Sequence, residues 1–240
     1  MNRLLHAIFF EFRAFRVFKI QILISLFIMP LSYMLIILLN TGGDQQASLY
    51  LLTGFVVASL IGTYVSLLGL RVSNLMMPEV LEMYAAFPIK MRTVALSYLI
   101  TYSLYVLPQI IVALIVIAII SSSSIAWGLF VVNVILTMVT LSGIGMFLGF
   151  FFKNYFVAQG VLPLLSWLFL FITPLYYQAK SSIFFSINPL NSCVKLLRYA
   201  IGLYDGIIIW DYVYLIGLIV MLSFFINRRF LKVYLLEKRF

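Results

Sequence analysis

A short polar stretch, residues 76–92, is the part of this sequence whose residue types are best suited to binding a partner. It reads MMPEVLEMYAAFPIKMR, in a chain that is 65% hydrophobic and only 10% charged. Its charged side chains are Glu79, Glu82, Lys90 and Arg92. A proline suits the first position of a helix, and the helix dipole favours acids in the first turn. We predict a water-exposed helix of about nine residues, roughly 13 Å long at 1.5 Å per residue.

Residues that could perform catalysis are scarce. The chain has one histidine, His6, and one cysteine, Cys193, so no internal disulfide can form and neither residue has partners for a metal site. Asp211 is the one acid that approaches the long apolar runs. No G-x-x-x-x-G-K-[ST] loop is present to bind the phosphates of ATP. We expect no catalytic, metal or cofactor site in this chain, and the energy for any uphill transport must come from another polypeptide.

Long apolar runs indicate an integral membrane protein. Mean hydropathy is +1.15, and the charged fraction lies far below the roughly 25% that is typical of soluble domains. One span needs about 20 apolar residues, and polar tracts with turn formers separate six such runs. The expected fold is all-α with six transmembrane helices, at about 20–39, 48–70, 94–120, 126–152, 156–177 and 208–227.

The distribution of cations predicts the orientation. If the N-terminus is cytoplasmic, 13 of the 16 Lys and Arg residues fall in inner segments, including the 228–240 tail, and three fall outside. This bias favours an even number of spans, with both termini in the cytoplasm. The net charge of +9 then reflects topology and attraction to anionic lipid headgroups. No soluble basic domain remains to bind nucleic acid.

Residues 1–19 are interpreted as a helix that lies on the inner membrane surface. At 100° per residue the polar side chains share one face, and most large apolar side chains lie away from it. Glu11 does not fit this pattern. The alternative is a cation cluster that only sets the topology. The polar face consists of Asn2, Arg3, His6, Arg13 and Arg16.

The segment 178–207, between the last two spans, predicts an amphipathic helix on the outer side. Apolar residues recur there with helical spacing after an Asn-Pro pair. The aromatic residues before it suit the outer membrane interface, and we expect the helix to lie there or to dip into it as a re-entrant element. One hypothesis is an outer gate that a passing substrate parts, and the other is an interface anchor. The candidate gate residues are Tyr176, Tyr177, Asn188, Pro189 and Arg198.

One face of the third span carries side chains with polar tips at i, i+4, i+7 and i+11. They are Tyr98, Tyr102, Tyr105 and Gln109. Such a stripe could line a path for an amphipathic solute. Hydrogen bonds between packed helices explain it as well, because a Tyr hydroxyl needs a partner in lipid.

The fourth span contains a G-x-x-x-G motif formed by Gly145 and Gly149. Small residues at this spacing let two helices approach closely. We expect packing within the bundle rather than a seam between two copies of the chain.

Taken in order, three segments resemble the membrane-spanning subunits of type-2 ABC transporters, the permeases of bacterial exporters. The first is the amphipathic N-terminal helix. The second is EVLEMYAAFPIKMRTVALSYLI (79–100), similar to the family's acid, apolar, small-small-x-Pro, basic pattern. The third is INPLNSCVKLLRYAIGLYDG (187–206), similar to its Asn-Pro, apolar, Arg, Gly segment. The resemblance implies a six-span half-transporter that pairs with a second copy, identical or different. It also implies two copies of a cytoplasmic ATPase, which carry ATP and Mg.

In that family the segment equivalent to 76–92 is a coupling helix that sits in a cleft of the ATPase. From the residues alone, a helix that only connects two spans is the alternative. The resemblance implies an ATPase contact set of Glu79, Glu82, Met83, Phe87, Pro88 and Lys90, with Arg3, Glu11 and Arg13 of the N-terminal helix nearby.

The expected function is that of a permease subunit of an ATP-driven exporter in the plasma membrane. The lack of charges in the spans favours a hydrophobic or amphipathic cargo, such as an antimicrobial peptide, an antibiotic or a lipid, because an anionic solute would need cations along its route. Within this class, export of a lipid-linked glycan is the alternative. From another class, the chain could be a non-transporting membrane immunity or assembly protein, which would need no ATPase.

Overall fold

The structure, a computed structural model, describes residues 2–15, 29–85, 91–121, 125–152, 154–177, 185 and 187–237. Within these ranges the backbone is helical with short turns and contains no strand, as the all-α prediction required. The helices are α1 (Asn2–Phe15), α3 (Met29–Asn40), α4 (Gln45–Ile61), η3 (Gly62–Leu68), α5 (Gly69–Leu75), α6 (Pro78–Ala85), α7 (Met91–Ile120), α8 (Trp127–Phe151), α9 (Tyr155–Ile172), α11 (Pro189–Ala200) and α12 (Ile209–Glu237).

Five helices in the described part of the chain are long and apolar enough to cross a membrane. They overlap the last five predicted spans, which supports a membrane-embedded protein. The predicted first span, 20–39, lies partly outside the described residues, and α3 supplies only its second half. The five helices are Gln45–Leu75, Arg92–Ile120, Trp127–Phe151, Tyr155–Ile172 and Ile209–Arg229.

Polar residues between the apolar runs determine where helices begin. Asp44 accepts a hydrogen bond from the Gln46 amide at 3.0 Å and so caps α4, and Asn154 caps α9 in the same way. These side chains satisfy amide groups that a helix start leaves without partners. Gly42 and Gly43 turn the chain between α3 and α4 with φ angles of +57° and +88°, which other residues rarely adopt.

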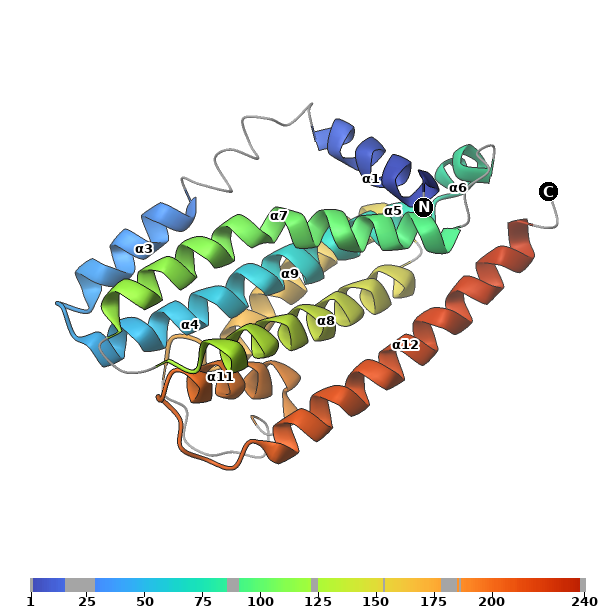
Figure 1. Cartoon of the computed structure of the whole chain (residues 1–240). Coiled ribbons are helices and arrows are strands. Elements are labelled where there is room, and N and C mark those ends of the chain that lie inside the picture. The colour runs from blue at the N-terminus through green and yellow to red at the C-terminus, as the bar shows by residue number, and fades with distance from the viewer. Residues whose placement is uncertain are drawn as a thin grey trace.

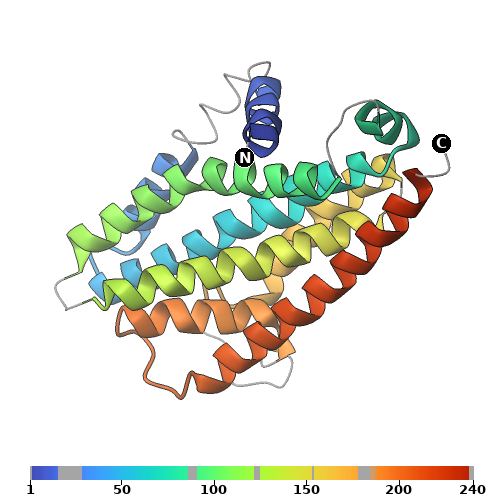
Figure 2. The ribbon, with the colours of Figure 1, turned by 45° about the vertical axis from the view of Figure 1, so that its right-hand side comes forward.

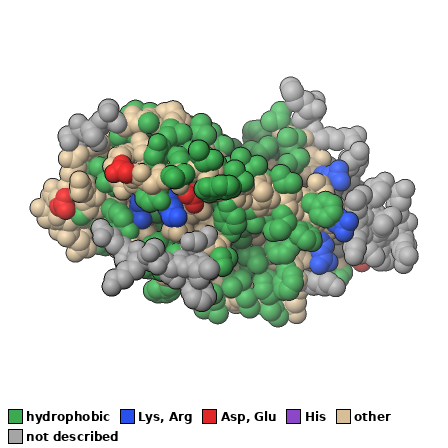
Figure 3. Space-filling view, turned by 90° about the horizontal axis from the view of Figure 1, so that it is seen from below, with side chains coloured by type: hydrophobic (Ala, Val, Ile, Leu, Met, Phe, Trp, Pro, Cys, Tyr) green, Lys and Arg blue, Asp and Glu red, His purple; other side chains and the backbone are tan. Residues whose placement is uncertain are grey.

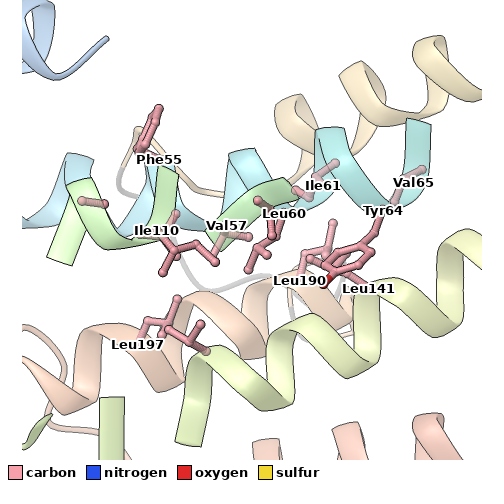
Figure 4. Packing of buried hydrophobic residues seen from close by; sticks show 14 of the residues in the cluster. Phe55, Val57, Leu60, Ile61, Tyr64, Val65, Ile110, Leu141, Leu190 and Leu197 are labelled. Carbon is pink, nitrogen blue, oxygen red and sulfur yellow. The ribbon is translucent and has the colours of Figure 1, made fainter. Parts of the chain in front are cut away.

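The continuous rod formed by α4, η3 and α5 lies at the centre of the bundle and packs against α7, α8 and α9 (Figure 1). Figure 4 shows its side chains Leu60 and Tyr64 near Leu141 of α8, with Ile110 of α7 and Leu190 of α11 also in the cluster. In a bilayer such contacts stabilise the fold through close packing rather than removal from water, because lipid is as apolar as the core. The rod is therefore the element on which the surrounding helices are positioned.

The middle of this rod, η3, is a π-helix, a rare form that is frequent at functional sites. Two glycines of α8 fit against the rod, one at η3 and one at the start of α5. Gly145 lies directly against the carbonyl oxygen of Tyr64, and a Cβ placed on Gly149 would come within 2.6 Å of the Gly69 carbonyl oxygen. The G-x-x-x-G pair of α8 thus makes a close helix contact inside the bundle, and larger side chains would push α8 away.

The two ends of the bundle carry different elements. In Figures 1 and 2, α6 lies outside the helix bundle at one end, and we call this the α6 end. At the opposite end α11 packs among α4, α8 and α12, and we call this the α11 end. Figure 3 shows charged side chains toward both ends and hydrophobic side chains between them. This pattern fits a bundle whose middle lies in hydrocarbon.

Candidate functional site

A groove of about 540 Å³ lies beside the central rod. The rod contributes residues of α4 and η3, α7 and α9 contribute the flanking walls, and Tyr176 lies at the α11 end. None of the described residues that line it is charged. Its volume falls within the roughly 300–1,000 Å³ that is usual for ligand sites. The polar lining residues are Ser59, Thr63, Ser66, Tyr105, Gln109 and Ser166.

The lining of this groove is amphipathic. Hydroxyl and amide groups stand beside aromatic side chains, including Phe55 of α4 and Trp167 and Phe171 of α9. Trp167 and Phe171 stack with their ring centroids 6.2 Å apart. Such a surface can hold a molecule with an apolar body and uncharged polar groups. It offers no opposite charge to compensate an ion that enters from water.

The polar stripe of α7 is divided by the packing of the bundle. Tyr105 and Gln109 line the groove, as a substrate path requires. Tyr98 and Tyr102 are buried and do not line this groove, so the structure does not bring the four residues of the stripe together in it. Tyr98 and Tyr102 lie nearer the α6 end, where α1 covers α7. There the Arg71 guanidinium lies over the Tyr98 ring, 5.0 Å from its centroid.

Residues 173–177 after α9, which we call the strap, contribute Tyr176 to the lining of the groove. The Tyr50 hydroxyl of α4 donates a hydrogen bond to the Tyr177 carbonyl at 2.7 Å. Asn188 caps α11 and also donates its amide to the Thr173 hydroxyl at 3.0 Å. The strap is therefore held by α4 on one side and by the start of α11 on the other.

Arg198 makes the most buried of the contacts that hold the strap. Only 7% of it is exposed, and its guanidinium donates to the Leu175 carbonyl at 2.9 Å. The guanidinium also stacks on the Tyr50 ring, 3.4 Å from the centroid. Burial lowers the pKa of Arg198 to about 10, so it remains protonated at neutral pH. The expected gate residues Tyr176, Tyr177, Asn188 and Arg198 thus converge on the strap and its partners, and Pro189 starts α11.

The structure buries α11 more completely than an amphipathic pattern indicates. The predicted apolar face at Leu190, Val194 and Leu197 is buried, but so are Asn191 and Arg198. The helix sits between α4, α8 and α12, so these polar groups meet protein on every side. A surface anchor would leave them in contact with headgroups and water. The contacts therefore make α11 an integral part of the bundle, whereas the choice between gate and anchor stays a prediction.

A second hydrogen-bonded group ties α11 to α8 and α12. Asn133 of α8 donates to the Leu196 carbonyl at 2.7 Å and accepts from the Tyr212 hydroxyl at 2.6 Å. The Ser192 hydroxyl lies 2.6 Å from Asp211. Asp211, the acid nearest the apolar runs, therefore has a structural partner, and Asn133 is a contributor that the sequence did not single out.

At the α6 end, α6 presents exposed acids. Its eight residues begin at Pro78, and Glu79 and Glu82 are exposed. Met83 lies on the same helix, although the structure does not describe its side chain. Their role in contacting a partner stays a prediction. Phe87, Pro88 and Lys90 lie outside the described residues.

Glu11 of α1 has an internal role. Arg71 Nη2 donates to both carboxylate oxygens of Glu11, at 2.9 and 3.0 Å, and Arg71 Nε adds a third bond at 3.2 Å. Glu11 is 4% exposed, so its expected place on a partner-contact surface is corrected: it attaches α1 to the rod. Arg13 on the same helix is exposed, whereas the side chain of Arg3 is not described.

The hydroxyl residues of the rod were overlooked by the sequence analysis, although a pattern was present. Ser59, Thr63 and Ser66 follow one another at i, i+4 and i+7, the spacing of one helix face. The same test that identified the tyrosine stripe of α7 would have found them. Trp167 carried no such pattern, since α9 is apolar on most faces.

Comparison of the sequence with protein-family models and with curated proteins gives no match.

Proposed function

We propose that this chain is the membrane-spanning subunit of an ATP-driven exporter of uncharged hydrophobic or amphipathic molecules. The groove carries this proposal. It is uncharged along its described lining, it lies at the level of the membrane-spanning helices, and Tyr176 of the strap lines it. The resemblance of three sequence segments to type-2 ABC permeases supports the same function.

A separate ATPase would bind at the α6 end, which the cation distribution places in the cytoplasm. Glu79 and Glu82 of α6 are exposed, so a soluble partner can reach them. α6 follows directly on α5, the last part of the central rod, after a turn at residues 76–77. A displacement of α6 would therefore act on the rod that forms the floor of the groove. ATP and Mg belong to the two copies of the partner.

A second copy of the chain, identical or related, would cover the open side of the groove. Ser59, Ser66 and Gln109 are only half-buried there. Polar groups that face lipid are costly, and polar residues in membrane helices usually face another helix or a cavity. Two facing grooves would enclose a larger, uncharged chamber between the copies.

Export of a lipid-linked glycan is less well supported, because its phosphates would need cations along the route. Among the described residues of the α11 end, Arg198 is the most buried cation, and it is already engaged by Leu175 and Tyr50. Lys195 lies 3.9 Å from Asp211. Neither projects into the groove, whose described lining is uncharged.

Filling the groove tests this function without altering its polar groups. Gly62 belongs to the lining, and a Cβ there meets nothing within 4 Å, so Gly62→Phe would extend a ring into the groove. Cells that express the chain with its co-purifying ATPase would be scored for resistance to membrane-active peptides and amphipathic antibiotics. We expect Gly62→Phe to abolish resistance while the protein remains folded and bound to the ATPase.

Gly217→Phe on α12 is the matched control, because its Cβ also points into open space and Gly217 does not line the groove. It should retain resistance. If Gly62→Phe protects cells as well as the wild-type chain does, the groove is not the route. If the wild-type chain protects without any ATPase, the immunity-protein alternative takes its place.

A further inference from the structure

A second cavity, of about 280 Å³, lies between α7, α8 and α12 in the half of the bundle nearer the α6 end. α12 packs along α8 but approaches α7 only sparsely. The space between them is bounded on α7 from Arg92 to Leu99 and on α12 from Ile219 to Asn227. At 1.5 Å per residue each of these walls is roughly 10–12 Å long.

The lining of this cavity changes in polarity along the helices. Arg92 and Asn227 lie at the α6 end, whereas Leu96, Leu99 and Ile219 lie deeper in the bundle. Arg92 is exposed, and none of the described lining residues is acidic. The cavity therefore fits a molecule with an anionic head and an apolar body.

Further cations lie next to the mouth of this cavity. Arg228 and Arg229 follow Asn227 on α12, and both are exposed. Arg228 stacks on the Phe224 ring, 4.2 Å from its centroid, which holds its guanidinium close to the helix. The acids Glu79 and Glu82 are on α6 and do not line the cavity. The local charge is positive and complements an anion.

The depth of the cavity selects a lipid over a soluble anion. The hydrocarbon core is about 30 Å thick, so one leaflet contributes about 15 Å. The cavity wall is roughly 10–12 Å long, and its cation, Arg92, lies at the end of the spans. This length suits the part of an acyl chain nearest the phosphate, with the phosphate at the cation. A soluble anion would occupy only the charged mouth and leave the apolar part unfilled.

We infer that the cavity between α7, α8 and α12 binds an anionic phospholipid of the leaflet at the α6 end, with its phosphate at Arg92 and one acyl chain along α12. Basic pockets between transmembrane helices bind anionic headgroups in this way. The site is distinct from the groove of the proposed export route, which lies between α7, the rod and α9. It does not depend on the chain being an exporter.

Native mass spectrometry of the purified full-length chain tests the headgroup preference. Phosphatidylglycerol and phosphatidylcholine with the same acyl chains would be titrated in parallel. We expect the chain to retain more phosphatidylglycerol than phosphatidylcholine. The substitution Arg92→Gln should weaken the binding of phosphatidylglycerol about fivefold, which is the effect of one basic residue near an anionic headgroup. Lys195→Gln removes a half-buried cation of α11, at the opposite end of the bundle and outside the cavity, and should change nothing. Equal losses in both variants, or equal retention of both lipids, would overturn the inference.

A thiol placed in the cavity tests the position of the acyl chain. Ser223 lines the cavity on α12, while Gly217 lies on the same helix outside it. With the natural Cys193 fully buried, a thiol reagent should label Ser223→Cys in detergent. Phosphatidylglycerol should slow the labelling of both thiols differently. We expect the factor by which it slows labelling of Ser223→Cys to be at least three times the factor for Gly217→Cys. Inorganic phosphate alone should not slow the labelling of Ser223→Cys. Equal protection at both positions, or protection by phosphate alone, would exclude a lipid chain in this cavity.

Discussion

The α11 end and the α6 end of this bundle use polar residues in opposite ways. At the α11 end, polar groups such as Asn133, Asn188, Asn191 and Arg198 are at least half-buried and bonded within the chain. At the α6 end, the charged residues of α6 and the end of α12 are exposed. At the α11 end the chain itself supplies partners for these polar groups. At the α6 end, the charged side chains of α6 and of the end of α12 face the surroundings.

This difference indicates where the chain can be rigid and where it can receive a partner. A buried polar group without its bond costs free energy, so the α11 end should tolerate few changes. Exposed charges contribute little to stability, so stability is not the reason for the exposed acids of α6 in a chain with 10% charged residues. Binding at the α6 end is the reason we propose. Glu11 is the exception at that end, since it is buried against Arg71.

The largest effect is expected at the contact between α8 and the central rod, on which both ends of the bundle depend. In Gly145→Leu the new side chain would collide with the Tyr64 carbonyl and separate α8 from η3. We expect it to lower the free energy of unfolding by about 3 kcal/mol, at the upper end for overpacking. Thermal unfolding in detergent, monitored by labelling of the buried Cys193, would measure it. Gly160→Leu is the matched control because its Cβ meets nothing within 4 Å. Equal stability of the two variants would show that the α8 contact is not tight.

A smaller loss, confined to the α11 end, is expected for Arg198→Ala. The substitution leaves the Leu175 carbonyl without its donor and should cost about 2 kcal/mol. Burial raises the pKa of Cys193 to about 12, so its thiol reacts only after α11 opens, and its labelling rate should rise in this variant. Lys195→Ala, on the same helix but only half-buried, should change the rate little. Comparable rates in both variants would mean that Arg198 does not secure the strap.

The smallest stability effect is expected at the α6 end. Arg71→Gln leaves the buried Glu11 carboxylate without its charged partner, and we expect a loss of about 1 kcal/mol, because Arg71 remains partly exposed and water can reach the site. Adding Glu11→Gln should recover part of it, since an amide pair carries no unpaired charge. Protease accessibility of α1 would report its detachment. If the double variant is less stable than Arg71→Gln alone, the pairing of Arg71 with Glu11 is contradicted.

The sequence was sufficient for the parts of the fold that hydropathy controls. Five spans follow from apolar runs and their polar breaks, and α11 follows from a helical period after Asn188. The burial of Arg198 does not follow from that period, because its acceptor is the carbonyl of Leu175, which lies in a different segment. Glu11 and Arg71 are 60 positions apart, and no local pattern joins them.

The candidate site was predictable only in part for the same reason. Tyr98 and Tyr105 share one helix face in the sequence, yet neighbouring helices cover only the first. A helical-wheel projection shows which side chains lie on the same face of a helix. The packing of neighbouring helices decides which of those side chains reach a cavity. The hydroxyl stripe of Ser59, Thr63 and Ser66 was detectable, and searching every span for polar periodicity would have revealed it.

The central claim is that a separate ATPase acts on this bundle through the acids of α6. The most direct measurement is affinity purification of the tagged full-length chain from its native membrane, with quantification of the co-purifying ATPase. We predict that the double variant Glu79→Lys, Glu82→Lys reduces the bound ATPase at least about tenfold, because reversed charges at an interface cost several kcal/mol. Asp205→Lys makes the same change at an exposed acid of the α11 end and should leave binding intact. An ATPase retained equally by both variants, or no ATPase bound to the wild-type chain, would contradict the claim.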